Sequence, residues 1–359
     1  MALEAIEYSD DIQNLLLSRG HDKLAHHPNK YLICDEERRS LKEVSPSTYI
    51  PIISLEELGG RSRPVAIEKL KKACKEHGFF QVANHGVSEA LMGDMMEIAE
   101  EYFDMPLEDE VHLCTNDYRK RTRVCTRFCN TSNKDVHMHW RDYLRHPCYP
   151  IEYHIDSWPN NPSSYRYIAA KYATAMRGVT LKLLGGISES LGLARDYIEN
   201  ALGEQNQTMQ INCYPPCPKP ELTPLALAAH TDPNCLTLVQ DNGVSGLQIM
   251  KDGTWLDIPP LHEAFFVHIG DQLQVISNGE YKSLVHRAMT NSVKRRMSIP
   301  TFYGPSLDAV IKPASSLASA NVHGPLYVPF TYRRFLDHFY SIKLYTTTLQ
   351  QFEVANCTK

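Results

Sequence analysis

The sequence has no long apolar run, and this absence excludes most membrane proteins. No apolar stretch approaches the roughly 20 residues that a membrane-spanning helix needs, although 43% of the 359 residues are hydrophobic. The first residues, MALEAIEYSDDIQ, carry acidic groups where a secretory signal peptide has a basic start and an apolar stretch. We therefore expect a soluble, cytoplasmic protein without a membrane partner.

Closely spaced cysteine pairs are also missing. Ten cysteines in a chain of this length are too dilute for a disulfide scaffold, and a cytoplasmic chain favours free thiols. Cys125 and Cys129, like Cys213 and Cys217, have a spacing that a structural zinc site could use, but the sequence has no CxxC pair. The simpler interpretation is that these are small buried hydrophobic residues, and a zinc site stays the alternative.

Positive charge is not in excess, and the net charge of -5 argues against nucleic acid as the main partner. One local run is nevertheless basic, RKRTRVCTR at residues 119–127. Such a run is usually a solvated surface, but it could also face the mouth of a pocket and attract an acidic substrate. We expect a small-molecule partner and a monomeric chain.

The sequence pattern divides the chain into five segments. Residues 1–48 are polar and lack clear periodicity, so we expect a lead-in segment there. Residues 49–160 alternate β-rich runs with helical patterns and predict an N-terminal domain, and residues 161–205 predict supporting helices. Residues 206–310 are the expected β-rich core, and residues 311–359 the expected C-terminal helical segment.

Several elements can be predicted within these segments. Apolar residues at helical spacing predict a helix over Val65–His77, and Ser88 is the expected N-cap of the next helix. A broad apolar face predicts a long helix within residues 164–192. From Gln207 onward, strand-like runs recur at roughly ten-residue intervals between Pro, Gly, Asp and Asn, which predicts an antiparallel sandwich or jelly roll.

A candidate metal site lies in this β-rich part. His230 and Asp232 are two residues apart in a predicted strand and therefore point to the same face. His286, in SLVHRAM, suits a later strand returning across the same sheet. Two imidazoles and one carboxylate leave other coordination positions open, as non-haem Fe(II) oxygenases require. A second HxD pair, His154 and Asp156, is expected in a surface loop and lacks an anion-binding partner downstream.

A candidate anion site follows ten residues after His286. Arg296 and Ser298 form an RxS pair whose side chains share one face of a strand. The guanidinium offers a planar fork of donors that matches a carboxylate, and the serine adds a hydroxyl donor. In isolation this pair would be a surface Arg and a core Ser, but beside the predicted metal ligands it suits a dicarboxylate.

These motifs resemble those of the plant 2-oxoglutarate/Fe(II)-dependent dioxygenase family (isopenicillin N synthase-like). The branch is that of specialised-metabolism hydroxylases, similar to salicylate hydroxylases and hyoscyamine hydroxylase. The matching pieces, in order, are FFQVANHGV, WRDYLR, NCYPPCPKPE, HTDPNCLTLVQD, GLQIMKDGTWLDIPP, IGDQLQVISNGEYKSLVHRAMTN and RRMSIPTFYGP. The resemblance implies a mainly β fold with α: a distorted double-stranded β-helix, the cupin-like jelly roll, flanked by helices and an α/β N-terminal portion.

The resemblance also implies roles for individual residues and cofactors. The metal and catalytic residues would be His230, Asp232 and His286, and the metal would be Fe(II). The co-substrates would be 2-oxoglutarate and O2, with ascorbate as reductant. The resemblance assigns 2-oxoglutarate binding to four residues: Arg296, Ser298, Asn212 and Tyr214.

Substrate-side residues also follow from the resemblance. Phe302 matches a position that often stacks on aromatic substrates, and Gln210 and Phe128 are further candidates, each with a core or surface role as the alternative. One departure is His268, in VHIGD where relatives commonly have VNIGD. A lone strand histidine is usually a hydrogen-bonded core residue, so we expect no ligand role for it.

The expected activity is hydroxylation, or desaturation or another oxidation, of a small aromatic or alicyclic plant metabolite, with succinate and CO2 as co-products. An ascorbate-dependent oxidase of the aminocyclopropanecarboxylate-oxidase type is the first alternative. A non-catalytic, cupin-like protein that binds a small ligand is another. A zinc hydrolase could use the same three ligands, but it would leave the RxS pair unexplained, and no HExxH helix is present.

Overall fold

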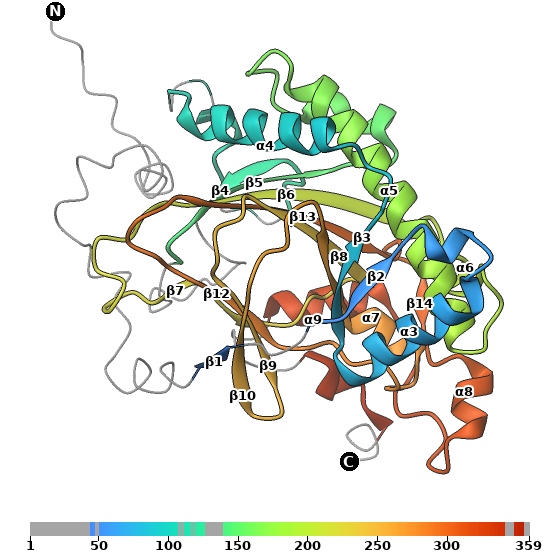
Figure 1. The fold of residues 1–359 in the computed structure, drawn as a ribbon. Coiled ribbons are helices and arrows are strands. Elements are labelled where there is room, and N and C mark those ends of the chain that lie inside the picture. The colour runs from blue at the N-terminus through green and yellow to red at the C-terminus, as the bar shows by residue number, and fades with distance from the viewer. Residues whose placement is uncertain are drawn as a thin grey trace, which may run out of the picture.

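Two β-sheets face each other at the centre of the molecule, and helices cover the outer face of the larger one (Figure 1). The computed structural model describes residues 44–46, 50–106, 109, 111–115, 117, 119–125, 139–341 and 348–354. The larger sheet has the strand order β2-β3-β11-β8-β13-β6-β5-β4. Its strands are β2 (Ile52–Ser54), β3 (Phe79–Ala83), β4 (Arg123–Cys125), β5 (Asp142–Pro147), β6 (Asn206–Tyr214), β8 (Leu236–Asp241), β11 (Phe265–Ile269) and β13 (Arg296–Gly304).

The smaller sheet forms the opposite wall. Its strand order is β1-β10-β9-β12-β7, and a separate pair joins β14 to β15. The bounds are β1 (Val44–Pro46), β7 (Leu225–His230), β9 (Leu247–Lys251), β10 (Thr254–Ile258), β12 (His286–Met289), β14 (Val310–Ile311) and β15 (Phe330–Thr331). Two facing sheets of mostly antiparallel strands are the predicted jelly roll, and the predicted double-stranded β-helix is confirmed.

Helices flank the sheets on the outside. The α-helices are α3 (Arg63–Glu76), α4 (Glu89–Asp104), α5 (Tyr165–Ser190), α6 (Tyr197–Ala201), α7 (Asp271–Ile276), α8 (Ser315–Ala320) and α9 (Tyr332–Ser341). The 3-10 helices are η4 (Glu57–Gly59), η6 (Val111–Leu113), η7 (Ile151–Tyr153), η8 (Ile155–Ser157) and η9 (Thr348–Phe352). Among the described residues, none of the helices combines the length and the apolar character needed to cross a membrane.

The predicted helices are confirmed, with small shifts at their ends. The helix expected over Val65–His77 is α3, and the long helix expected within residues 164–192 is α5. Ser88 is the N-cap of α4, since its Oγ accepts a hydrogen bond from the Leu91 amide at 3.3 Å. The N-terminal strands do not form a sheet of their own, because β3 pairs with β11 and β5 pairs with β6.

Along the strands of the larger sheet, apolar side chains of the core alternate with side chains that line a cavity, so the two faces of the sheet differ. Leu144, Ile211 and Ile299 point outward and belong to the core beneath the helices. Their neighbours Arg145, Gln210 and Ser298 point inward and line a cavity. Because side chains of a strand alternate between faces, one sheet supplies both an apolar core and a polar cavity wall.

Candidate active site

The cavity has a volume of about 570 Å³, which is within the range of small-molecule sites. Residues of both sheets line it, together with residues of α9. Its lining includes most of the residues that the sequence predicts as functional: His230, Asp232, His286, Arg296, Ser298, Asn212, Tyr214, Phe302 and Gln210. Phe128, also predicted on the substrate side, lies outside the described residues.

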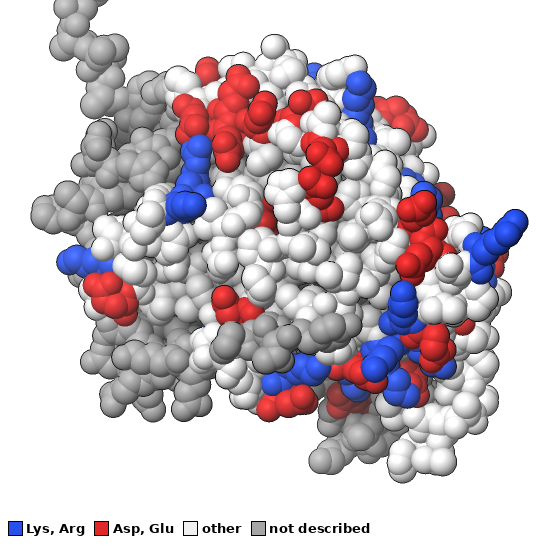
Figure 2. Space-filling model, in the orientation of Figure 1, with Lys and Arg blue, Asp and Glu red and all other residues white. Residues whose placement is uncertain are grey.

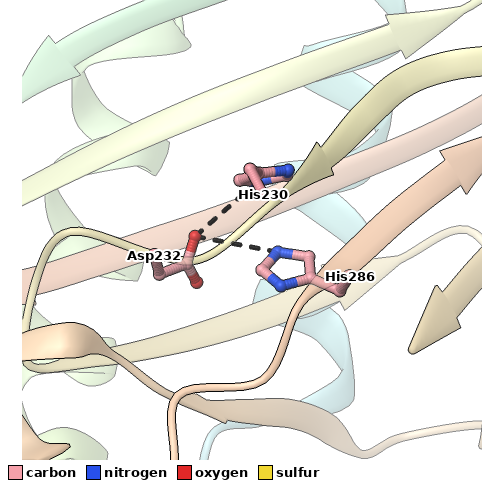
Figure 3. Close-up of side chains that lie close together, drawn as sticks. All are labelled: His230, Asp232 and His286. Carbon is pink, nitrogen blue, oxygen red and sulfur yellow. Dashed lines mark ion pairs between the residues drawn. The ribbon is translucent and has the colours of Figure 1, made fainter. Parts of the chain in front are cut away.

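The three predicted metal ligands converge in this cavity (Figure 3). His230 ends β7, and His286, at the start of β12, lies directly opposite it in the antiparallel pairing. Asp232 follows β7 in the turn toward β8, and its Oδ1 is 3.9 Å from His230 Nε2 and 3.7 Å from His286 Nε2. All three ligand atoms lie within 4.8 Å of one another.

Both histidines are held in the tautomer that a metal requires. His230 Nδ1 donates to the Ala228 carbonyl at 2.8 Å, and His286 Nδ1 donates to the Leu284 carbonyl at 3.2 Å. A carbonyl can only accept, so the proton sits on Nδ1 and each Nε2 presents a lone pair toward Asp232. Burial, followed by the neighbouring His286, holds the pKa of His230 well below its usual value, which keeps this imidazole neutral.

Asp232 is fixed by its surroundings as well. Its Oδ2 accepts a hydrogen bond from Thr237 Oγ1 at 2.6 Å, so Oδ1 is the oxygen that faces the histidines. The Asp271 amide donates to the Asp232 carbonyl at 2.8 Å. A Cβ at Gly270 would lie 2.2 Å from the Asn234 carbonyl oxygen, so only glycine allows this close approach of the β11–α7 connection.

This donor set fits a divalent metal ion with open coordination positions. Two neutral imidazole nitrogens and one carboxylate oxygen on one side are the facial arrangement that non-haem Fe(II) enzymes use. In the described parts of the chain, no other group of three His, Cys, Asp or Glu side chains meets the same criterion. The second HxD pair, His154 and Asp156, lies in the 3-10 turns η7 and η8.

The cysteines support the simpler interpretation. The seven described cysteines form no disulfide with one another, and they include Cys125, Cys213 and Cys217. Burial raises the pKa of the Cys213 thiol, so this side chain stays protonated. Cys129 lies outside the described residues. The described members of the two cysteine pairs therefore behave as small buried side chains.

The predicted dicarboxylate site forms a network at the start of β13. Ser298 lies opposite Asn212 in the pairing of β13 with β6, and Asn212 Nδ2 donates to Ser298 Oγ at 3.1 Å. Arg296 lies opposite Tyr214, and its Cζ is 5.2 Å from the centre of the Tyr214 ring. Arg296 is buried, and within the described residues its side chain makes one hydrogen bond, from Nε to the Val244 carbonyl. The rest of its fork remains available for a carboxylate.

Two of the predicted substrate residues, Phe302 and Gln210, both contact Arg145 farther along the sheet. Phe302 lies near the end of β13, and the Cζ of Arg145 is 5.0 Å from the centre of its ring. Gln210 Oε1 accepts from Arg145 Nη1 at 3.2 Å, while Gln210 Nε2 donates to Asn212 Oδ1 at 2.7 Å. Gln210 therefore connects the predicted co-substrate residues to the predicted substrate residues.

Sequence reasoning gave no role to Arg141 and Arg145, both in WRDYLR and both lining the cavity. Arg141 Nη1 donates to Asn212 Oδ1 at 2.8 Å. The period-two spacing of Arg141, Tyr143 and Arg145 was the available signal, since it places all three on one face of a strand. Of the basic run at 119–127, Arg123 is buried at the cavity and Arg121 is exposed beside it, so the described part of the run, residues 119–125, faces a pocket.

His268 lies in the second layer behind the metal ligands. Its ring centre is 4.5 Å from that of His286, and it lines the cavity. The expectation of a hydrogen-bonded core residue is wrong for its Nε2, which is buried and has no hydrogen-bond partner in the described structure. Burial, followed by His286, holds the pKa of His268 well below its usual value, so the ring is neutral.

Comparisons with known proteins agree with this site. Residues 205–305 match the 2OG-Fe(II) oxygenase superfamily, and residues 50–161 match the family described as non-haem dioxygenase in morphine synthesis N-terminal. Protein DOWNY MILDEW RESISTANCE 6 of Arabidopsis thaliana is 44% identical over 320 residues, which are 88% of this chain and 92% of that protein. Flavanone 3-dioxygenase 2 of Oryza sativa subsp. japonica is 40% identical over 345 residues, covering 96% and 97%.

A solved structure agrees over almost the entire length. The crystal structure of JOX2 in complex with 2OG, Fe and JA has a TM-score of 0.83 and 31% identity to this chain, and the match covers 97% of this chain and 98% of JOX2. Such identity across nearly the whole sequence, with the same fold, shows that this chain belongs to the 2-oxoglutarate and Fe(II)-dependent oxygenases and is a non-haem dioxygenase.

Proposed function

We propose that this dioxygenase hydroxylates a small aromatic or alicyclic metabolite in the cavity between its two sheets. The single observation that carries the proposal is the convergence of His230, Asp232 and His286 in the same cavity as Arg296 and Phe302. A metal site, a carboxylate site and an aromatic surface in one cavity suit a reaction between a keto diacid, O2 and an organic substrate.

In this proposal His230, Asp232 and His286 hold Fe(II), and Arg296 with Ser298 binds the distal carboxylate of 2-oxoglutarate. When bound, the iron and the keto acid supply the oxidising chemistry, in which O2 is consumed, 2-oxoglutarate becomes succinate and CO2, and one oxygen atom enters the substrate. The protein positions 2-oxoglutarate and the substrate, and the carbonyl contacts on Nδ1 orient Nε2 of each histidine toward the metal position.

Names of relatives support a small organic substrate. One similar protein is a flavanone 3-dioxygenase, and the JOX2 structure is a complex with JA. The cavity volume of about 570 Å³ is sufficient for a small organic substrate beside the co-substrate. Phe302 offers a flat apolar surface for a ring.

The test begins with titration of the purified chain with Fe(II) and 2-oxoglutarate without oxygen. A weak visible charge-transfer band is expected from the chelate, and its absence in folded protein would contradict the proposal. Small plant metabolites are then screened for substrate-dependent succinate release. Turnover without succinate would favour the ascorbate-dependent oxidase, and binding without turnover would favour the non-catalytic alternative.

A further inference from the structure

Arg145, on β5, carries a positive charge in the cavity, and no carboxylate of the described residues forms an ion pair with it. Its neighbours are neutral or basic: the Gln210 amide, the Phe302 ring, and Arg123 directly opposite on β4. Like charges directly opposite each other on paired strands are unfavourable, so the structure alone gives no reason for this placement.

The excess of positive charge is a property of the cavity. Where the structure describes it, the lining contains eight arginines and two aspartates, one of which is the predicted metal ligand Asp232. Two of the arginines have their own carboxylates, since Arg119 pairs with Asp117 and Arg333 pairs with Asp308. On the face shown in Figure 2, by contrast, basic and acidic side chains are interspersed, and the net charge of the chain is -5.

The guanidinium of Arg145 lies beside the predicted co-substrate site and not within it. Its strand partner Gln210 is four residues from Tyr214, the partner of Arg296, a separation of roughly 14 Å at about 3.4 Å per residue. The side chains of Gln210 and Asn212 stand between Arg145 and Ser298, so the guanidinium is outside the group of residues predicted to hold the keto diacid. Arg145 therefore belongs to the part of the cavity where the substrate binds.

A neutral substrate would be poorly matched to this position. A ligand that fills the cavity displaces the water around the guanidinium, and a buried charge without a partner is strongly unfavourable. Burial already lowers the pKa of Arg145, but an arginine stays protonated in proteins. A carboxylate replaces the lost hydration with two parallel charge-assisted hydrogen bonds.

We propose that the substrate is a carboxylic acid, whose carboxylate binds Arg145 and whose ring system lies beside Phe302. The inference rests on the proposed function, because it names the substrate class of the same cavity. Arg123, Arg145, Gln210 and Phe302 are the specificity-determining residues of this substrate site, and the first two set the sign of the charge that it accepts.

The experiment measures binding without turnover. The full chain is loaded with Fe(II) and saturating 2-oxoglutarate in the absence of oxygen, so Arg296 is occupied. Calorimetry then compares three acids with their primary amides: benzoate with benzamide, cinnamate with cinnamamide, and cyclohexanecarboxylate with its amide. Each pair has one shape and differs in charge. A charge-assisted hydrogen bond should make at least one acid bind about 10- to 100-fold more tightly than its amide.

Variants assign the preference to one side chain. Arg145→Gln keeps a hydrogen-bonding group and should remove the preference for the acid, whereas Arg145→Lys should retain part of it. Arg333→Gln is the matched control, because this arginine also lines the cavity but is paired with Asp308, and it should keep the preference. Thermal unfolding confirms that each variant folds.

Equal binding of acid and amide in all three pairs, or a preference that survives Arg145→Gln, would overturn the inference. An equal loss of the preference for the acid in Arg145→Gln and Arg333→Gln would also overturn it. Such a result would mean that the positive potential of the whole cavity, and not a contact with Arg145, causes the preference. The chelate band is recorded on the same samples. A preference that depends on Arg145 in protein lacking the band would support the acid-binding site while contradicting the proposed function, so the two failures are distinguishable.

Discussion

The two ends of the cavity are built differently. At the metal end, main-chain carbonyls fix both histidines, and a hydroxyl from a neighbouring strand fixes Asp232. At the substrate end, Arg145 is held by another side chain, Gln210, and lies against the Phe302 ring. Main-chain contacts depend on the fold alone, whereas side-chain contacts change with each substitution. The metal end is therefore preorganised, and the substrate end is free to differ between relatives.

Removing the carboxylate of Asp232 should have the largest effect on activity, because it removes one of the three predicted metal ligands. Asp232→Ala leaves two histidines facing an empty position, so iron binding and succinate formation should fall by more than the roughly 10- to 100-fold typical of losing an outer-shell partner. Iron content and succinate release measure this, and circular dichroism checks the fold. His154→Ala, in the other HxD pair, is the control and should retain activity. Full activity of Asp232→Ala would refute the assigned site.

Arg296→Ala tests the co-substrate site beside the metal. Loss of a charge-assisted contact should raise the 2-oxoglutarate concentration for half-maximal rate by about 10- to 100-fold, with a smaller effect on kcat. The matched control is Arg295→Ala, because the neighbouring arginine points away and pairs with Asp104 at the surface. An exposed pair contributes about 0–1 kcal/mol, so this variant should have ordinary kinetics. Equal effects of the two substitutions would contradict the assignment.

Gly270→Ala tests whether the close main-chain packing at Gly270 holds the turn that carries the metal ligand Asp232. The new Cβ would lie 2.2 Å from the Asn234 carbonyl oxygen, so the turn that carries Asp232 must shift. Such overpacking typically lowers the free energy of unfolding by about 1–3 kcal/mol, measured by urea denaturation. Gly178→Ala in α5 is the control, since its Cβ would meet nothing within 4 Å and should stabilise the helix by about 0.5–1 kcal/mol. Ordinary stability of Gly270→Ala would contradict the proposed close approach.

The same contrast explains what the sequence could predict. The spacing of His230 and Asp232 predicted that they would meet, although Asp232 lies in the turn after β7 and not on the strand, and both the sequence pattern and the resemblance pointed to His286 and Arg296. Arg145 joins the proposed substrate site only because β5 pairs with β6 in a register that sets it opposite Gln210. Nothing in the local sequence fixes that register, since it depends on strands far apart along the chain. For the same reason the joining of β3 and β5 to the core sheet could not be predicted, although helices such as α5 could.

His268 lies behind the metal end, and substituting it should give the smallest effect. His268→Asn introduces the residue that relatives commonly have, and the Nε2 that it removes makes no hydrogen bond in the described structure. What is lost is the ring contact with His286, 4.5 Å between centres, and contacts of this kind contribute about 0.5–1.5 kcal/mol. Thermal unfolding should therefore show a small loss of stability, and the iron content should stay near that of the unmodified protein, because both ligand histidines keep their carbonyl contacts. A large loss of iron would mean that His268 orients His286, and the metal end would then depend on side chains as the substrate end does.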